Sequence, residues 1–248
     1  MYTVFAPDTP QFRRGQDALL TVIPRLEGGT PQGRALLSEL TRRLAGVPGG
    51  AEVGGSSAGD LAFSTAVYGH FPQMLTVIAG LSLLILTTAL RSVVLALKAV
   101  VLNLVSLGAA FGFIMLFWQQ GHGSFLYGVS ATGAIRDWIP VVVFACLYGL
   151  SMDYEVFVMA RMREEYDHLI GTDNATDQAI VAALARTGRL VTSAAVILMV
   201  SFLTLTADPN QIVRVVGTTL AAGVLVDAVI IRTLLVPALV SLLGHWNW

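Results

Sequence analysis

The protein is a chain of 248 residues, of which 55% are hydrophobic and 12% are charged, whereas soluble domains have about 25% charged residues. Fifteen basic and sixteen acidic residues give a net charge of −1, so no basic surface for nucleic acid is expected. This composition excludes a disordered or nucleic-acid-binding chain and predicts a membrane protein.

Residues 1–70 contain no apolar run long enough to cross a bilayer, so we expect them to lie in water. Their patterns predict a strand, two helices and a second strand, at 2–6, 11–26, 32–45 and 51–53. Thr30 and Pro31 are typical of a helix cap and a first helical residue. We therefore expect a small α/β segment, too small to bury much core alone.

Residues 71–248 contain five apolar runs, each near the roughly 20 residues that a membrane-spanning helix needs. The predicted spans are 72–90, 93–118, 139–160, 189–207 and 211–243, with a loop at 161–188 between the third and fourth. The predicted fold is an all-α polytopic membrane protein with five transmembrane helices. Membrane lipids are expected to surround these helices.

The distribution of basic residues predicts the orientation of these spans. Arg91 and Lys98 lie at the turn between the first two spans, and four arginines lie in or beside the 161–188 loop. The 119–138 connection on the other side holds only Arg136. Because basic loops stay in the cytoplasm, we expect a multi-pass protein of the inner (plasma) membrane with residues 1–70 outside and the C-terminus inside.

The third predicted span contains a charged residue at membrane depth. Asp153 lies 13 residues after Pro140, which places it about 20 Å into a hydrocarbon core of about 30 Å. A charge there costs at least about 2.5–3.5 kcal/mol, and the phenol of Tyr154 can donate a hydrogen bond to a carboxylate. A carboxyl group whose surroundings switch can bind and release a proton. The pair indicates a proton relay; the alternative is a structural hydrogen bond from Asp153 to a neighbouring helix.

Three further charged residues in the spans are assigned structural roles. Glu155 lies about 200° around the helix from Asp153, and we expect it to form a boundary ion pair with a nearby arginine, Arg161 or Arg163. Asp227 and Arg232 are five residues apart, about 140° on an α-helix, so we expect each to find a partner elsewhere.

Two other polar side chains lie in the second predicted span. Lys98 is expected to extend its amine to the cytoplasmic interface. Asn103 is expected to donate a hydrogen bond to another helix.

The pattern gives little support to an enzyme. An intramembrane aspartyl hydrolase would need two carboxyl groups sharing a water, but neither Asp153 nor Asp227 has the flanking glycines of such proteases. No HExxH zinc motif and no GxxxxGK[ST] phosphate loop occurs. We expect neither metal nor cofactor.

The third span and its flank contain the run Gly149-Leu-Ser-Met-Asp-Tyr-Glu-Val-Phe157, followed by Arg161 and Arg163-Glu-Glu-Tyr166. This run resembles the MMPL family of the resistance-nodulation-division (RND) transporters. Matching pieces elsewhere are Val53-Gly-Gly-Ser-Ser57, Arg91-Ser-Val, Lys98-Ala-Val-Val-Leu-Asn103, Gly223-Val-Leu-Val-Asp227, Arg232, Pro237-Ala-Leu239 and Trp246-Asn-Trp248.

The resemblance implies export of lipids or other hydrophobic molecules, driven by the proton gradient, with Asp153 and Tyr154 as half of a proton relay. Ser151 is expected to support the relay with its hydroxyl, with Glu155 as a further supporting residue. Gly149, one turn before Asp153, is expected to permit close approach of a neighbouring helix.

Members of this family have twelve spans in two related halves, so this chain resembles the end of a porter domain followed by spans eight to twelve. We therefore expect a partner, either the missing transporter half or a second copy of this chain. The alternatives are a non-transporting assembly or regulatory partner and, with less support, the hydrolase. A transporter is expected to fail with Asp153→Asn and to tolerate Asp227→Asn better, a hydrolase to fail with either, and a structural partner to survive both.

Overall fold

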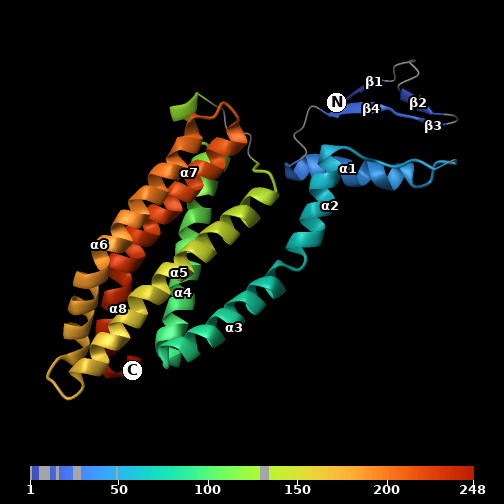
Figure 1. Ribbon diagram of the computed structural model, residues 1–248. Coiled ribbons are helices and arrows are strands. Elements are labelled where there is room, and N and C mark those ends of the chain that lie inside the picture. The colour runs from blue at the N-terminus through green and yellow to red at the C-terminus, as the bar shows by residue number, and fades with distance from the viewer. Residues whose placement is uncertain (1, 6–11, 15–16, 25–28, 49, 129–133) are drawn as a thin grey trace.

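The computed structural model describes residues 2–5, 12–14, 17–24, 29–48, 50–128 and 134–248. Long helices form a bundle, and the N-terminal segment lies beyond one end of it, beside the start of the yellow helix α5 (Figure 1). The C-terminus lies at the opposite end of the bundle, near the turn between α3 and α4.

The N-terminal segment begins with two antiparallel strand pairs, one of which lies within the other along the chain. Strand β1 (Tyr2–Phe5) pairs with β4 (Thr21–Pro24), and β2 (Arg13–Arg14) pairs with β3 (Asp17–Ala18). The helix predicted over 11–26 is therefore wrong in the part that the structure describes, and residues 11, 15–16 and 25–26 lie outside that part. The β-branched residues of β4 favour a strand, and pairing with β1 outweighs the helical spacing.

Helix α1 (Pro31–Leu44) confirms the second predicted helix, and the Thr30 hydroxyl caps it by accepting a hydrogen bond from the Gly33 amide at 3.1 Å. The strand predicted at 51–53 is wrong: these residues form an irregular connection before α2 (Ser56–Tyr68). Glycines flank the connection, and no described strand pairs with it.

Among the residues that the structure describes, five helices are long and apolar enough to cross a membrane, as predicted. In chain order they are α3 (Phe71–Leu90); α4 (Val93–Ile114), extended by a π-helix to Gln119; α5 (Trp138–Leu169); α6 (Ala175–Thr204), extended by a 3₁₀ turn to Ala207; and a composite last span. The last span consists of α7 (Gln211–Val226), a π-helix (Asp227–Leu235), α8 (Val236–Leu243) and a 3₁₀ turn (Gly244–Asn247).

The helices α5 and α6 are longer than predicted. Both continue into the expected 161–188 loop, and only Ile170–Asn174 connects them. Ion pairs one turn apart stabilise these helix ends: Arg163 Nε lies 3.1 Å from Asp167. Glu165 also joins the two helices, since its carboxylate lies 2.8 Å from Arg186.

The central helices differ from the outer ones in burial. In α4, α5 and the last span, 39% of the most apolar stretch is buried within the chain, compared with 11% in α3 and 6% in α6. The core therefore lies among α4, α5 and the last span, and the described part of the chain leaves most of the surface of α3 and α6 uncovered.

The N-terminal segment contacts the bundle at the first residue before α5. Arg34 of α1 forms an ion pair with the Asp137 carboxylate at 2.6 Å, and the Tyr68 hydroxyl donates to the Asp137 carbonyl at 2.5 Å. Burial, reinforced by the charge of Asp137 and opposed by that of Arg34, raises the pKa of Tyr68. Tyr68 therefore keeps its proton and acts as a hydrogen-bond donor at neutral pH.

The C-terminal segment corrects the prediction for Lys98. The amine of Lys98 does not reach the surface: the residue is buried, and the amine donates to the Leu239 carbonyl at 3.0 Å and to the Asn247 side chain. Asn247 is fully buried, donates to the Val240 carbonyl at 2.7 Å and accepts from the Ser92 hydroxyl at 2.5 Å. The last span turns back after α8 and supplies these acceptors beside the amine.

We predict that Asn247→Ala destabilises the protein by about 2–3 kcal/mol, because it leaves a buried ammonium group without one of its acceptors. Thermal unfolding of the purified protein in detergent measures the effect. The adjacent Trp246 is 71% exposed, so Trp246→Ala is the matched control and is expected to change stability little. Equal effects of the two substitutions would contradict this role of Asn247.

Candidate functional site

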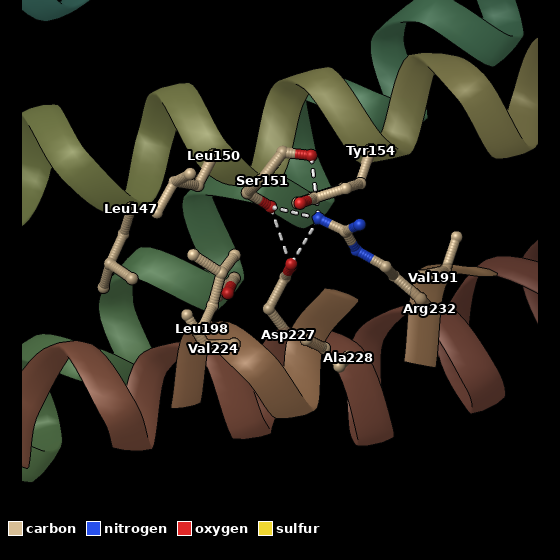
Figure 2. A pocket seen from close by; sticks show the side chains of 12 residues that line it. Leu147, Leu150, Ser151, Tyr154, Val191, Leu198, Val224, Asp227, Ala228 and Arg232 are labelled. Carbon is tan, nitrogen blue, oxygen red and sulfur yellow. Dashed lines mark hydrogen bonds and ion pairs between the residues drawn. The ribbon is translucent and has the colours of Figure 1, made fainter. Parts of the chain in front are cut away.

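A polar cluster lies inside the bundle, between α5 and the π-helix of the last span (Figure 2). We use this name for Ser151, Tyr154, Glu155, Asp227 and Arg232. Glu155 is 3% exposed, Asp227 8% and Arg232 6%. Three charged residues are therefore enclosed among helices whose other surfaces are mostly apolar.

The α5 members of the cluster share one face of the helix. Tyr154 and Glu155 follow Ser151 by three and four residues, which is the spacing of neighbours along a helix face. Asp153 lies about 200° from Ser151 and is exposed. The prediction that Asp153 and Glu155 point to different sides is confirmed, but Asp153 does not join the polar cluster.

The pairing of Asp227 with Arg232 corrects the sequence prediction. The two side chains form an ion pair, although five residues on an α-helix would separate them by about 140°. The segment is π-helical, with hydrogen bonds between residues five apart: the Val236 amide bonds to the Ile231 carbonyl. Positions 227 and 232 therefore lie one above the other.

A proline follows the π-helix at position 237. Proline has no amide N–H and its ring crowds the carbonyl four residues earlier in an α-helix. The wider π-helical turn relieves this crowding, which gives a local reason for the unusual geometry. The Thr233 hydroxyl donates to the Ala228 carbonyl, also five residues away, at 2.6 Å.

Ser151 connects the two sides of the cluster. Its hydroxyl donates to Asp227 Oδ1 at 2.8 Å, and its carbonyl accepts from Arg232 Nη2, also at 2.8 Å. The Arg232 guanidinium also lies over the Tyr154 ring, 5.1 Å from its centre. A cation over an aromatic face is attracted to it, so Tyr154 stabilises the position of Arg232.

Glu155 occupies a different environment from the one predicted. It pairs with neither expected arginine: Arg161 contacts Glu164 and Glu165, and Arg163 contacts Asp167. Glu155 instead lies within electrostatic reach of the Asp227 and Arg232 charges. Its Oε1 atom is buried and has no hydrogen-bond partner among the residues that the structure describes.

A cavity of about 20 Å³ adjoins the cluster, which is room for about one water molecule. Ser151, Tyr154, Asp227 and Arg232 line it together with Ser106 of α4, and the α6 side is apolar. A water there would have hydroxyl, carboxylate and guanidinium partners. The arrangement has the groups needed to hold and pass a proton: carboxylates, a phenol and a hydroxyl around a small polar cavity.

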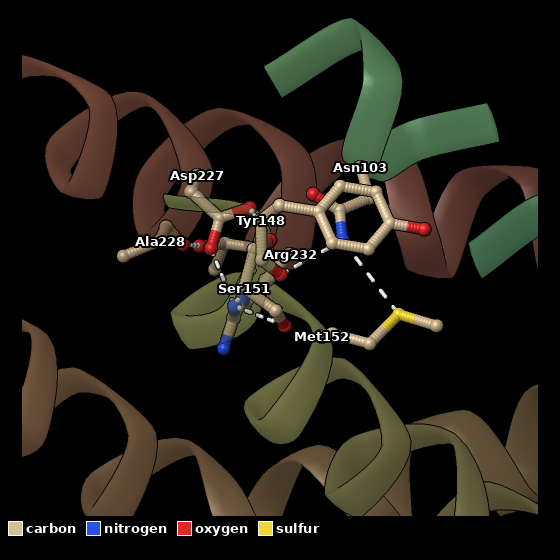
Figure 3. Close-up of polar contacts among 8 residues, drawn as sticks. Asn103, Tyr148, Ser151, Met152, Asp227, Ala228 and Arg232 are labelled. Atoms are coloured by element: carbon tan, nitrogen blue, oxygen red, sulfur yellow. Dashed lines mark hydrogen bonds and ion pairs between the residues drawn. The ribbon is translucent and has the colours of Figure 1, made fainter. Parts of the chain in front are cut away.

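Asn103 holds α4 against α5 beside the cluster, as predicted. Its side-chain amide donates to the Tyr148 carbonyl at 3.3 Å and contacts the Met152 sulfur at 3.6 Å (Figure 3). Because Met152 adjoins Ser151 in the chain, this bond fixes the part of α5 that faces the last span.

Asp153 belongs to an open stripe of α5, which we define as Val142, Ala145, Gly149 and Asp153. All four are exposed and follow one another at helical spacing. A Cβ atom built on Gly149 would meet no atom of its described surroundings within 4 Å. No described helix of this chain therefore uses the close approach that Gly149 permits, and that role stays a prediction.

Comparison with known proteins gives a consistent assignment. The model of the MMPL family matches residues 15–248. A membrane protein of Streptomyces coelicolor is 37% identical over 89% of this chain and 31% of its own length. The mycolic acid-containing lipids exporter MmpL11 of Mycolicibacterium smegmatis is 31% identical to this chain. The heme uptake protein MmpL11 of Mycobacterium tuberculosis is 33% identical. Each match covers 93% of this chain and 24% of the relative's own length.

The chain thus spans about a quarter to a third of the length of these relatives. The matched region includes the five spanning helices and the polar cluster. The chain belongs to the MMPL family of membrane proteins.

Proposed function

We propose that this chain is part of an exporter of lipids or other hydrophobic compounds that is driven by the proton gradient. The observation that supports the proposal is the polar cluster, in which two carboxylates and one arginine are buried within membrane-spanning helices. Each charge at this depth costs at least about 2.5–3.5 kcal/mol on insertion scales, and such residues commonly mark proton or ion pathways.

The geometry supports proton binding inside the cluster. In the described part of the chain, Arg232 is the one cation of the cluster, and it faces two carboxylates, Asp227 and Glu155. It can compensate one negative charge, so the cluster as a whole favours one additional proton. Tyr154 and Ser151 line the small cavity together with Asp227, and their hydroxyl groups can relay that proton there.

Asp153 takes part in the proposed relay from the open stripe. A carboxylate that faced lipid here would be costly, so the stripe needs a protein partner. The residues before Asp153 on this stripe are small or aliphatic, which suits close helix packing. We propose that another transporter half or a second copy of this chain covers the stripe and brings a partner to Asp153.

The proposed substrate is a lipid or another hydrophobic molecule. One MmpL11 relative is named an exporter of mycolic acid-containing lipids and another a heme uptake protein. The compounds in both names are largely apolar, which supports a substrate class rather than one compound. The proposed site of action is the plasma membrane, with the N-terminal segment outside and the C-terminus in the cytoplasm, as the basic residues favour.

The intramembrane hydrolase receives less support from the geometry. Its chemistry needs two carboxyl groups that share a water, whereas Asp153 lies on the exposed side of α5 and Asp227 is buried against the other side. Asp227 is also neutralised by Arg232. A non-transporting partner with the same bundle remains the alternative that the next experiment separates.

We predict that Asp153→Asn and Asp227→Asn each lower proton uptake at least about tenfold, because each removes a carboxyl group of the proposed proton pathway within the membrane. Because Asp227 forms an ion pair with Arg232, we no longer expect Asp227→Asn to be tolerated better than Asp153→Asn. Proteoliposomes that contain the chain and its membrane partner, an imposed pH gradient and an internal pH dye provide the measurement. Asp173→Asn, in the exposed α5–α6 turn, is the control. Normal uptake in both membrane variants would favour the non-transporting partner.

We predict that a cysteine at Ala145, in a Cys146→Ser background, cross-links efficiently to another polypeptide in native membranes, because the open stripe is covered there. A cysteine at Val196 of α6, which is 53% exposed, is the control and is expected to label with lipid-soluble maleimide without cross-linking. Mass spectrometry of the product distinguishes a second copy from a different chain. Labelling without cross-linking at both positions would overturn the proposed partner.

A further inference from the structure

We propose that the π-helix Asp227–Leu235 is a proton-sensitive switch: when Asp227 takes up a proton, Arg232 is released, the stretch tightens toward an α-helix and α8 turns about its axis. This inference rests on the proposed proton coupling and adds the movement that the proton produces. It is supported by the pairing geometry, the enclosure of the pair and the contacts of α8.

The ion pair and the helix geometry depend on each other. Asp227 and Arg232 face each other because the π-helix brings residues five apart into line. On an α-helix the same two positions would be about 140° apart and the pair would be broken. The ion pair therefore stabilises the π-helix relative to the α-helix.

A π-helix needs such stabilisation, because it is rare and most π-helices are single turns within α-helices. This one has nine residues and lies directly between α7 and α8. Pro237 destabilises a regular α-helix across its own position. The π-helical and α-helical forms of this stretch therefore differ less in free energy. A change in one charge can then shift the balance between them.

Asp227 is the group whose charge controls the pair. The α5 groups facing it are Ser151, Tyr154 and Glu155; α4 contributes the Ser106 hydroxyl and α6 only apolar side chains, Val191, Ala195 and Leu198. Arg232 is the only cation among the residues lining the cavity. When Asp227 is neutral, Arg232 keeps the Ser151 carbonyl but loses its ionic partner on the last span.

The contacts of α8 indicate which part of the chain the movement of the π-helix would reach. The Leu239 carbonyl of α8 accepts from Lys98 of α4, and the Val240 carbonyl accepts from Asn247. A turn of α8 about its axis moves these carbonyls away from their donors. Proton uptake in the middle of the membrane would thus loosen the C-terminal segment at the end of the bundle.

Distances between spin labels on α6 and α8 test the switch. Cysteines replace Ile197 and Leu242, which are 66% and 81% exposed, in a Cys146→Ser background, and pulsed electron resonance measures their separation in nanodiscs. Asp227→Asn mimics the protonated state and is expected to displace the distance distribution. Lowering the pH is expected to displace it in the same direction. Asp173→Asn, which removes a carboxylate of the exposed α5–α6 turn outside the cluster, is expected to leave it unchanged.

A second variant keeps the test decisive if Asp227→Asn does not fold. Pro237→Ala favours the α-helix without touching a titrating group and is expected to give the displaced distribution at every pH. Unchanged distances in Asp227→Asn, or unchanged distances in Pro237→Ala and in the wild type at low pH, would overturn the switch.

If Asp227→Asn loses proton uptake without a change in distance, the switch fails and the proposed function stands. If the distances shift but wild-type proteoliposomes take up no protons, the switch stands and the proposed function fails.

Discussion

The ion pair between Asp227 and Arg232 is the interaction on which the centre of this bundle depends. Two opposite charges in one span cannot remain unpaired in a low-dielectric interior, and the helix that holds them is π-helical where they pair. Ser151 adds hydrogen bonds to both partners and so joins α5 to the last span. Breaking such a pair by removing one partner is costly, since it leaves the other charge buried.

The charged residues of the spans lie in two different kinds of environment. Lys98 is surrounded by dipoles: a carbonyl of α8 and the amide side chain of Asn247. Glu155 has an oxygen without a described hydrogen-bond partner, although two other charges lie near it. The first arrangement holds the charge of Lys98 among hydrogen-bond acceptors, whereas the second leaves one carboxylate oxygen of Glu155 open to a further hydrogen bond.

Much of the fold could be predicted from the sequence because apolar runs of sufficient length have few alternatives in a membrane. The five spans and the interhelical bond of Asn103 follow from that constraint. The Asp227–Arg232 pair could not be predicted by assuming α-helical spacing; Pro237 was the one sign that the spacing changes. Glu155 could have been placed with Ser151 by their spacing of four residues, but the nearby arginines supported an ion pair that the structure does not form. Strand β4 forms by pairing with β1, which is not adjacent to it in the sequence, and local spacing does not reveal such a pairing.

The contact at Asp137 limits how the two parts of the chain can move. Asp137 immediately precedes α5 and is held by Arg34 and Tyr68 of the N-terminal segment. Ser151 lies fourteen residues further along the same helix, about 21 Å away. An α-helix resists stretching and compression over such a length because each backbone hydrogen bond fixes the next turn. A displacement of the N-terminal segment must therefore either break its contact with Asp137 or shift the part of α5 that contains Ser151. In the second case α5 moves as a rigid helix and transmits the displacement to the charged residues inside the bundle.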